Sequence, residues 1–328
     1  MNAQPTLNRL GHSGLVVSQV GLGCNNFGRA NTHTEDLAGT TEVVQSAIDA
    51  GITLFDTADI YGKQAGLSEE LLGKALGRQR DQVVIATKFG MDTAGANGPD
   101  AAARGSRKYI VQSVEASLRR LGTDWIDLYQ LHTPDPQTPI EETLLALDDL
   151  VRSGKVRYLG HSNFSGWQVA QAHYVAKELG THRFISSQNH YNLLDRRAEL
   201  EITPAAQEFG LGVLPYFPLA NGLLTGKYRS TTQAPADGRL SHTKPQILQQ
   251  APWKALETYF ALAESLDLTP LQLTFSWLAS QPTVASVIAG ATRQEQVVQN
   301  ATAVHALDAA TLQQIDAIFA PAERIALF

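Results

Sequence analysis

The chain has 328 residues, of which 43% are apolar and 18% are charged, a balance typical of a globular protein with a sizeable core. A formal net charge of −6 and the lack of Lys or Arg runs argue against nucleic acid and anionic membrane as partners. Because Cys24 is the only cysteine, intrachain disulfides and thiolate metal cages are excluded, which fits a reducing compartment.

The first predicted element is a hairpin, in which two β-rich runs, residues 6–10 and 15–17, flank a turn at residues 11–14. Eight further β-rich runs follow, each ending near a polar or glycine residue: residues 19–23, 53–56, 83–87, 125–131, 156–161, 184–188, 212–216 and 284–289. Between them, apolar residues at helical spacing predict helices, as at Val111, Val114, Leu118 and Leu121. Strands and helices therefore alternate along the chain.

This alternation implies parallel strands joined by right-handed crossovers, in either an open doubly wound sheet or a closed (β/α)8 TIM barrel. Eight repeats favour the barrel, whose floor the hairpin could cover. Polar residues at or just past the C-terminal ends of the runs also favour it, because these ends converge on one mouth in a barrel. These residues are Asp56, Lys88, His132, Ser162, Asn163, Gln188 and Tyr216.

Two long segments interrupt the alternation, residues 90–106, rich in Gly, Ala and Asp, and residues 230–251. Loops longer than about 15 residues are usually lids, binding loops or disordered segments. We expect both to be long loops at the C-terminal face of the barrel. Because neither has the composition of a domain linker, we expect residues 1–328 to form a single domain.

A carboxylate, a phenol, an ammonium and an imidazole stand at three successive strand ends, as Asp56 and Tyr61, then Lys88, then His132. A free phenol is a poor acid at neutral pH, but a nearby ammonium lowers its pKa. We therefore expect Tyr61 to donate a proton, Asp56 to hold Lys88, and His132 to orient a substrate carbonyl. Taken singly, each residue type is more often a packing residue, a helix cap or a surface charge, and only their combination predicts a catalytic site.

The arrangement resembles the aldo-keto reductases along almost the whole chain. Beyond the four residues above, five segments in matching order support the resemblance: residues 121–124 (LGTD), 160–164 (GHSNF), 187–189 (SQN), 223–227 (LLTGK) and 290–293 (GATR). The resemblance implies a (β/α)8 barrel with an N-terminal hairpin. It also implies that the four residues catalyse NADPH-dependent reduction of aldehydes and ketones to alcohols.

The resemblance further implies a set of residues that bind NADPH or NADP⁺. Ser162, Asn163 and Gln188 would hold the nicotinamide carboxamide, and Tyr216 would stack on the ring. Lys227 would meet the pyrophosphate and Arg293 the 2′-phosphate, which favours NADPH over NADH. The remaining residues implied around the cofactor are Gly23, Cys24, Asn25, Phe217, Leu219, Gly222, Leu224, Gly290 and Thr292, with Gln296 and Asn300 facing the adenine.

The chain departs from the family pattern at three positions. Members commonly have Ser and Gly where this sequence has Phe217 and Asn221, and Glu where it has Gln299. Phe217 is expected to alter how tightly the pyrophosphate loop closes. Cys24 lies near the expected nicotinamide, and we interpret it as a buried small hydrophobic residue without a catalytic role.

Three other classes compete with this interpretation. A different dinucleotide fold would need Gly-x-Gly-x-x-Gly, and Gly21 and Gly23 lack the third glycine. A metal-dependent hydrolase would need clustered ligands, whereas His132 and His161 stand outside any ligand motif, so we expect no metal. The alternative that stays open is a nicotinamide-binding regulatory or sensor subunit with little useful turnover, because some relatives in the family are channel-associated subunits.

The expected substrate is a small molecule with a carbonyl group, in a pocket walled by Phe27, Tyr61, Phe89 and the two long loops. The sequence leaves the oligomeric state open between a monomer and a homo-oligomer. No secretion signal stands at the N-terminus and no run of about 18 apolar residues occurs, so we expect a cytoplasmic protein.

Overall fold

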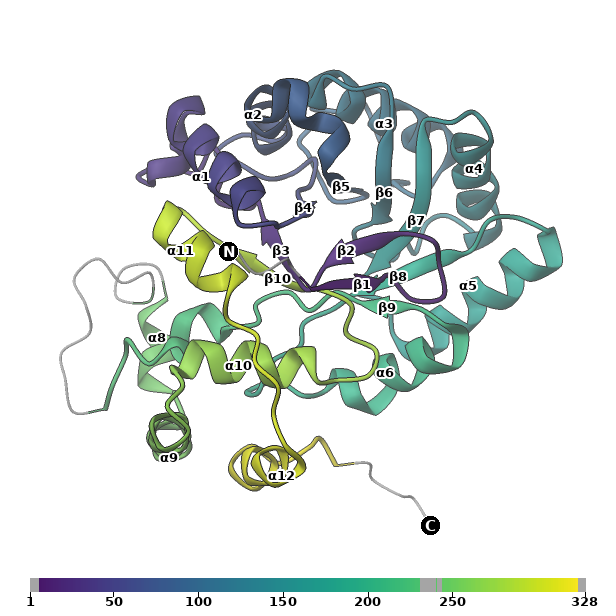
Figure 1. Cartoon of the computed structure of the whole chain (residues 1–328). Coiled ribbons are helices and arrows are strands. Elements are labelled where there is room, and N and C mark those ends of the chain that lie inside the picture. The colour runs from purple at the N-terminus through teal and green to yellow at the C-terminus, as the bar shows by residue number, and fades with distance from the viewer. Residues whose placement is uncertain (1–5, 231–239, 241–243, 324–328) are drawn as a thin grey trace, which may run out of the picture.

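The computed structural model describes residues 6–230, 240 and 244–323, which form an α/β barrel (Figure 1). In this part of the chain, eight parallel strands form one sheet in the order β10-β3-β4-β5-β6-β7-β8-β9. They are β3 (Val20–Gly23), β4 (Leu54–Asp56), β5 (Val84–Phe89), β6 (Ile126–Leu131), β7 (Val156–Ser162), β8 (Phe184–Gln188), β9 (Gly212–Val213) and β10 (Val287–Gly290). A parallel bridge between Val213 and Val284 joins the two ends of the sheet, so the barrel closes as the sequence predicts.

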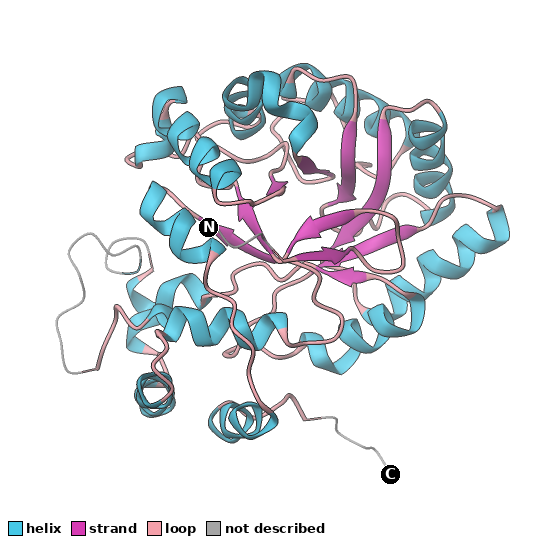
Figure 2. Ribbon diagram, in the orientation of Figure 1, coloured by secondary structure: helices cyan, strands magenta, loops and turns pink. Residues whose placement is uncertain are grey.

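Helices surround the sheet, as Figure 2 shows. Those of the barrel repeats are α1 (Leu37–Asp49), α2 (Leu67–Leu76), α3 (Arg107–Leu121), α4 (Ile140–Arg152), α5 (Gly166–Leu179), α6 (Ala198–Phe209), α10 (Pro270–Ala279) and α11 (Gln294–Ala301). The others are α8 (Pro245–Gln249), α9 (Trp253–Ser265) and α12 (Ala309–Ile318), with short 3-10 helices η1 (His33–Glu35), η2 (Gly77–Gln82) and η3 (Ala220–Thr225). Within the described residues, no helix combines the length and apolarity needed to cross a bilayer.

Local chemistry sets where several helices begin. Asp36 caps α1 by accepting a hydrogen bond from the Gly39 amide, and Ser165 begins α5 in a capping box with Gln168. In α3 the apolar face differs from the prediction at one residue, since Ile110 is buried whereas Val111 is 42% exposed. Val111 is three residues before Val114, which corresponds to a rotation of about 300° around the helix axis. Val111 therefore lies at the edge of the buried face and not at its centre.

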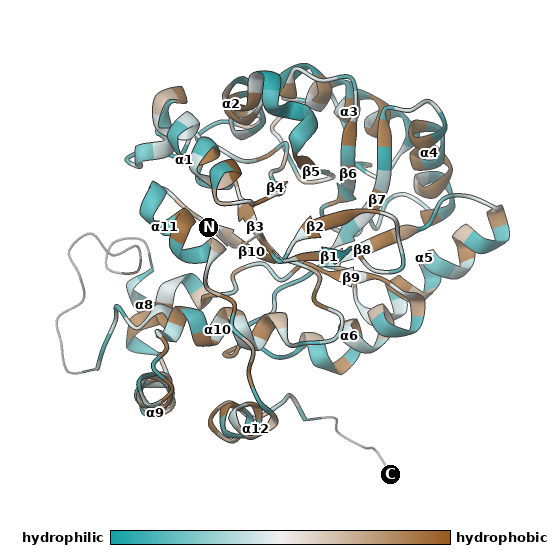
Figure 3. Cartoon of the chain, in the orientation of Figure 1, coloured by the Kyte–Doolittle hydropathy of each residue, from teal (hydrophilic) through white to brown (hydrophobic). Residues whose placement is uncertain are grey.

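The interior of the barrel is apolar at its floor. Inward side chains there include Leu54, Leu128 and Ile288, and they pack against Leu10 and Val17 of the N-terminal hairpin. The hairpin pairs β1 (Leu7–Arg9) with β2 (Val16–Ser18), so the prediction that it covers the floor is confirmed. Figure 3 shows hydrophobic residues along β2 and also along α4 in the surrounding layer of helices.

The last two predicted strands, residues 212–216 and 284–289, differ most from the observed strands, β9 and β10. The run 212–216 ends as a strand at Val213, after which Tyr216 forms only an isolated bridge with His190. The segment 90–106 contains neither helix nor strand, as predicted. The predicted loop 230–251 is interrupted by α8, which Pro245 begins at a position where its missing N–H is not needed. Residues 231–239 and 241–243 of that loop lie outside the described residues.

Candidate active site

The site lies at the C-terminal ends of the strands, directly above the apolar floor. Side chains in a strand alternate between the two faces of the sheet, so residues two apart share a face. Leu54 and Ala86 point into the barrel, and therefore Asp56 and Lys88, each two residues later, also point inward. The parallel pairing places Lys88 beside Gln130, which follows inward Leu128 by the same rule. The barrel interior therefore changes from apolar to polar within one side-chain layer.

An ion pair between Asp56 and Lys88 forms the centre of the site. Lys88 Nζ lies 2.6 Å from Asp56 Oδ1, 2.8 Å from the carbonyl oxygen of Thr57 and 3.5 Å from the Tyr61 hydroxyl. Lys88 has no exposed surface. Burial is the largest single influence and lowers the pKa of Lys88, but Asp56 and Tyr61 together raise it more, so the net pKa lies above its ordinary value. The ammonium therefore stays charged at neutral pH.

Tyr61 lies beside two other predicted site residues, Lys88 and His132. Its ring centroid lies 5.0 Å from Lys88 Nζ and 5.9 Å from the centroid of the His132 ring, at an interplanar angle of 84°. Burial raises the pKa of Tyr61 and Lys88 lowers it, with a net increase. The expectation of a lowered pKa is therefore wrong in its net direction, because loss of hydration outweighs the nearby ammonium. The phenol keeps its proton at neutral pH.

His132 is a neutral imidazole in this environment. Burial and the neighbouring Lys88 charge lower its pKa to about 3. Its Nδ1 has no hydrogen-bond partner among the described residues. A neutral imidazole carries one N–H donor, so His132 can offer a hydrogen bond to a ligand without carrying a charge.

The four residues predicted to hold a nicotinamide lie in one hydrogen-bond network. The Tyr216 hydroxyl donates to Asn163 Oδ1 at 2.9 Å, and Asn163 Nδ2 donates to the His132 carbonyl oxygen at 2.9 Å. Ser162 Oγ donates to the Gln188 carbonyl oxygen at 2.7 Å, while Gln188 Nε2 donates to Asp56 Oδ2 at 2.7 Å. The network thus joins this group to the central ion pair.

Two residues of the site region were missed by the sequence analysis. Gln130 is fully buried and its Nε2 lies 3.3 Å from Asp56 Oδ2. The inward alternation that begins at Leu128 would have identified it. The second is His190, whose ring lies parallel to that of Tyr216. No sequence signal identified it, because it follows β8 outside the regular alternation.

The loop after β9 contains a run of strained backbone. Phe217, Ala220 and Asn221 have φ values of 53°, 48° and 59°, in the left-handed region that favours glycine. Asn tolerates this region better than other residues with a side chain, which accounts for Asn221 where the family commonly has Gly. Phe217 has no such property, so its backbone is held by its surroundings. Backbone strain of this kind concentrates at ligand sites.

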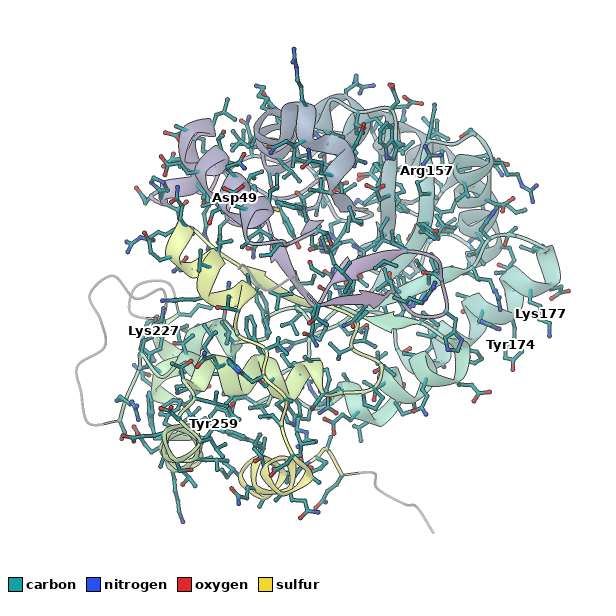
Figure 4. The ribbon with its side chains drawn as sticks, in the orientation of Figure 1. Asp49, Arg157, Tyr174, Lys177, Lys227 and Tyr259 are labelled. Atoms are coloured by element: carbon teal, nitrogen blue, oxygen red, sulfur yellow. The ribbon has the colours of Figure 1, made fainter. Side chains whose placement is uncertain are left out.

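Lys227 and Gly222 face each other in this loop, since a Cβ added to Gly222 would lie 3.1 Å from Lys227 Cε. Lys227 lies at the periphery, on the side of α8 (Figures 1 and 4). It makes no ion pair within the described residues. Leu224 is fully buried and Leu219 packs against the core, so both support the loop from beneath.

The end of β10 brings together further predicted residues. Gly23 pairs with Gly290 in the sheet. A Cβ added to Gly290 would lie 3.0 Å from Asn26 Nδ2 and 3.3 Å from Asn25 Oδ1. A side chain at either glycine would therefore crowd its neighbours, Asn25 and Asn26 at Gly290 and Ile288 at Gly23. Cys24 is fully buried beside them, as expected for a small hydrophobic residue.

Helix α11 begins beside this glycine pair. The Thr292 amide donates to Gln296 Oε1 at 2.8 Å, so Gln296 supports the start of the helix. Arg293 is exposed and makes no ion pair with any residue that the structure describes. Asn300 is only 4% exposed, which leaves little of it accessible to a ligand.

The predicted pocket walls require a correction. Phe27 and Phe89 are fully buried, and Phe89 stacks on Tyr129 with ring centroids 4.6 Å apart. Phe89 follows the inward residue Lys88 and therefore points outward, into the layer between sheet and helices. An open cleft is lined by residues 60, 62–65 and 92–96, and none of the four predicted catalytic residues is among them. Among the described residues, no group of three or more His, Cys, Asp or Glu could hold a metal ion.

Comparisons with known proteins agree on one family. The model of the Aldo/keto reductase family matches residues 19–320. An uncharacterized oxidoreductase YrpG from Bacillus subtilis is 37% identical over 94% of each chain. A putative voltage-gated potassium channel subunit beta from Schizosaccharomyces pombe is 36% identical over 96% of this chain and 94% of its own length. An L-glyceraldehyde 3-phosphate reductase from Escherichia coli is 35% identical over 95% of this chain and 92% of its own.

Proposed function

The chain belongs to the aldo/keto reductase family, and from this premise we propose that it is an NADPH-dependent oxidoreductase that reduces aldehydes and ketones to alcohols. The observation that supports this most is the buried Lys88–Asp56 pair, with Lys88 Nζ 3.5 Å from the Tyr61 hydroxyl at the barrel mouth. A buried charge is expensive unless it is paired, and such a pair beside a phenol is suited to proton transfer.

The residues present fit a nicotinamide dinucleotide. At one end of the site, side-chain donors and acceptors converge beside Tyr216. Such groups suit the planar carboxamide of a nicotinamide, and the Tyr216 ring suits its aromatic ring. At the other end, Gly23 and Gly290 keep the paired strand ends free of side chains, and Lys227 and Arg293 have no ion-pair partner among the described residues. A cradle of backbone amides at a helix start, with nearby cations, suits phosphate groups.

When bound, NADPH supplies the hydride that reduces the carbonyl carbon. Tyr61 donates its phenol proton to the carbonyl oxygen and is left as a phenolate. Lys88 stabilises this phenolate through its charge, and the proton is later regained from solvent. Asp56 keeps Lys88 charged and in place, while neutral His132 orients the carbonyl oxygen through an N–H donor.

Preference for NADPH over NADH is assigned to Arg293. It stands at the N-cap of α11 without a carboxylate partner in the described part of the chain. A guanidinium in that position can form a paired hydrogen bond with a 2′-phosphate, which NADH lacks. Gly290 and the amides of the first turn of α11 add the favourable end of a helix dipole.

The competing proposal is a cofactor-binding regulatory or sensor subunit. It is favoured by the relatives from Schizosaccharomyces pombe and Oryza sativa that are named as potassium channel beta subunits, each 36% identical. The complete Asp56, Tyr61, Lys88 and His132 set favours an enzyme, because a subunit that only binds the cofactor does not need a proton donor.

Consumption of NADPH separates the two proposals. The purified protein is mixed with NADPH and a reactive aldehyde such as 4-nitrobenzaldehyde, and the loss of NADPH absorbance is followed. We expect steady turnover that requires Tyr61. Tight binding of NADPH, seen by fluorescence, without any consumption across aldehydes, ketones and sugars would favour the regulatory subunit.

A further inference from the structure

Behind Tyr216 stands a second aromatic ring that neither the family match nor the proposed mechanism uses. The His190 and Tyr216 rings lie nearly parallel, at an interplanar angle of 7° with centroids 5.4 Å apart. They are brought together by a parallel bridge between the two residues, past the ends of β8 and β9. The imidazole therefore covers one face of the Tyr216 phenol.

Both nitrogens of His190 are engaged. Nδ1 lies 3.0 Å from Asp195 Oδ2, and Nε2 lies 3.1 Å from Asn192 Nδ2. An amide nitrogen can only donate, so Nε2 accepts and the ring proton resides on Nδ1, from which it is donated to Asp195. The ring is thus held at two points in one tautomer. With both nitrogens occupied, His190 is a structural ring here and not a proton donor to a substrate.

A third ring closes this arrangement from the side. Phe217 stands perpendicular to His190 at 5.8 Å and nearly perpendicular to Tyr216 at 5.3 Å. The Asn192 amide that binds His190 also donates to the Phe217 carbonyl oxygen at 2.9 Å, which helps to hold Phe217 in its left-handed conformation. Asn192 therefore holds the His190 ring and the Phe217 backbone through one amide group.

The Tyr216 hydroxyl, at the tip of the ring, donates a hydrogen bond to Asn163 Oδ1. Its ring is thus held at its tip by Asn163 and over one face by His190. We propose that His190, anchored by Asp195 and Asn192, is a positioning residue that sets the plane of Tyr216 for packing against the nicotinamide ring. This inference rests on the proposed function, in which Tyr216 stacks on the cofactor.

The physical basis is pre-organisation. An aromatic side chain that is free in the unbound protein loses rotameric freedom when a ligand packs on it, and this loss weakens binding. Removing the His190 ring should free Tyr216 and weaken NADPH binding by about 5-fold, within the cost expected for one immobilised side chain. The loss should act through Tyr216 and through no other contact.

A double-mutant cycle on NADPH affinity tests this route. Dissociation constants are measured by fluorescence titration for the wild type, His190→Ala, Tyr216→Ala and the double variant. We expect His190→Ala to raise the dissociation constant by about 5-fold in the wild-type background and by less than about 2-fold when Tyr216 is already absent. Equal losses in both backgrounds would overturn the proposal, because His190 would then act independently of Tyr216.

Two further variants separate the ring from its hydrogen bonds. His190→Phe keeps an aromatic face without the polar anchors and should recover most of the affinity. His190→Gln keeps polar groups without the ring and should behave like His190→Ala. The reverse order of the two variants would contradict a role through stacking. Asp195→Asn, which weakens the anchor while conserving size, should have a smaller effect that also disappears in the Tyr216→Ala background.

A measurement without cofactor keeps this inference distinct from the proposed function. The protein is labelled with 3-fluorotyrosine, and the Tyr216 signal is identified by its loss in Tyr216→Phe. In cofactor-free His190→Ala we expect that signal to shift and broaden as the ring becomes mobile. An unchanged signal would refute the positioning role even if NADPH binds well, whereas failure of the wild type to bind NADPH would refute the proposed function alone.

Discussion

The two ends of the proposed cofactor site are built on different physical principles. At the barrel mouth, Asp56 and Lys88 are almost fully buried and each has several hydrogen-bond partners. At the start of α11 and in the loop after β9, Arg293 and Lys227 are exposed and have no ion-pair partner within the described residues. The ion pair at the mouth is formed before any ligand binds, whereas the other end offers charges that a ligand would pair with.

We expect the buried charges at the mouth to serve the chemical step and the exposed cations at the other end to serve cofactor affinity. Buried charges interact in a low-dielectric setting with little screening, so their geometry can tune a nearby proton donor. Exposed cations are screened by salt and attract any anion, so they suit the binding of phosphates more than catalysis. Changes at the mouth should therefore alter stability and turnover, and changes at the other end should alter cofactor affinity.

The largest effect is expected from breaking the buried ion pair. Lys88→Met leaves the Asp56 carboxylate without its cation, and removing one partner of a buried pair costs about 3–5 kcal/mol of unfolding free energy. Urea denaturation measures this loss. The double variant Asp56→Asn with Lys88→Met should recover part of it, because no uncompensated charge remains. Lys74→Met, which removes an exposed lysine paired with Glu70, is the control and should change stability by less than about 0.5 kcal/mol.

Next in size is the loss of the proposed proton donor. Tyr61→Phe should lower kcat by at least about 100-fold while the dissociation constant of NADPH changes little, since general acid catalysis acts only on the chemical step. Steady-state kinetics and fluorescence titration measure the two quantities. Tyr174→Phe, at a 58% exposed position on α5, is the matched control and should have no effect. Turnover of Tyr61→Phe close to that of the wild type would remove Tyr61 from the mechanism.

The buried histidines predict how stability depends on pH. His161 lies between Phe164 and Phe184, and burial lowers its pKa to about 3, as for His132. The unfolded chain binds protons at these residues near pH 6.5, so their contribution to stability is complete above that pH and is lost as the pH falls towards 3. At pH 5 each histidine should cost about 2 kcal/mol relative to pH 8.

Denaturation between pH 8 and pH 5 checks this prediction. His161→Phe should flatten the profile by about 2 kcal/mol, because the phenyl ring has no proton to gain. Trp167→Phe, at a 64% exposed position on α5, serves as the control and should leave the slope unchanged, because neither side chain titrates. A profile equally steep in His161→Phe would mean that His161 does not remain neutral in the folded protein.

The smallest effect is expected at the phosphate end. Arg293→Ala should weaken NADPH binding by about 10-fold and NADH binding by much less, since a hydrogen bond between charged groups is lost only with NADPH. The preference for NADPH should also fall as salt is added, because the site is exposed. Arg119→Ala, at an exposed position on α3, is the control. Equal losses for both cofactors would exclude Arg293 from cofactor choice.

Much of the site could be predicted because strand periodicity is local. Two-residue alternation places Asp56 and Lys88 on the inner face once the strands are identified, and parallel pairing brings their ends together. The same alternation turns Phe89 outward, because it directly follows inward Lys88, so it packs on Tyr129 and does not form the expected pocket wall. The contacts among His190, Asp195 and Phe217 lie beyond the strand ends, where no periodicity applies.

The sequence by itself determined the alternation of strands and helices, favoured a closed barrel, and placed Asp56, Lys88 and His132 at successive strand ends. These depend on local periodicity, residue type and the number of repeats. Only the tertiary structure decided the net pKa of Tyr61, the burial of Phe27 and the ring stack behind Tyr216. Those properties depend on how much water is excluded and on which side chains from distant segments meet, and neither quantity is encoded at a single position.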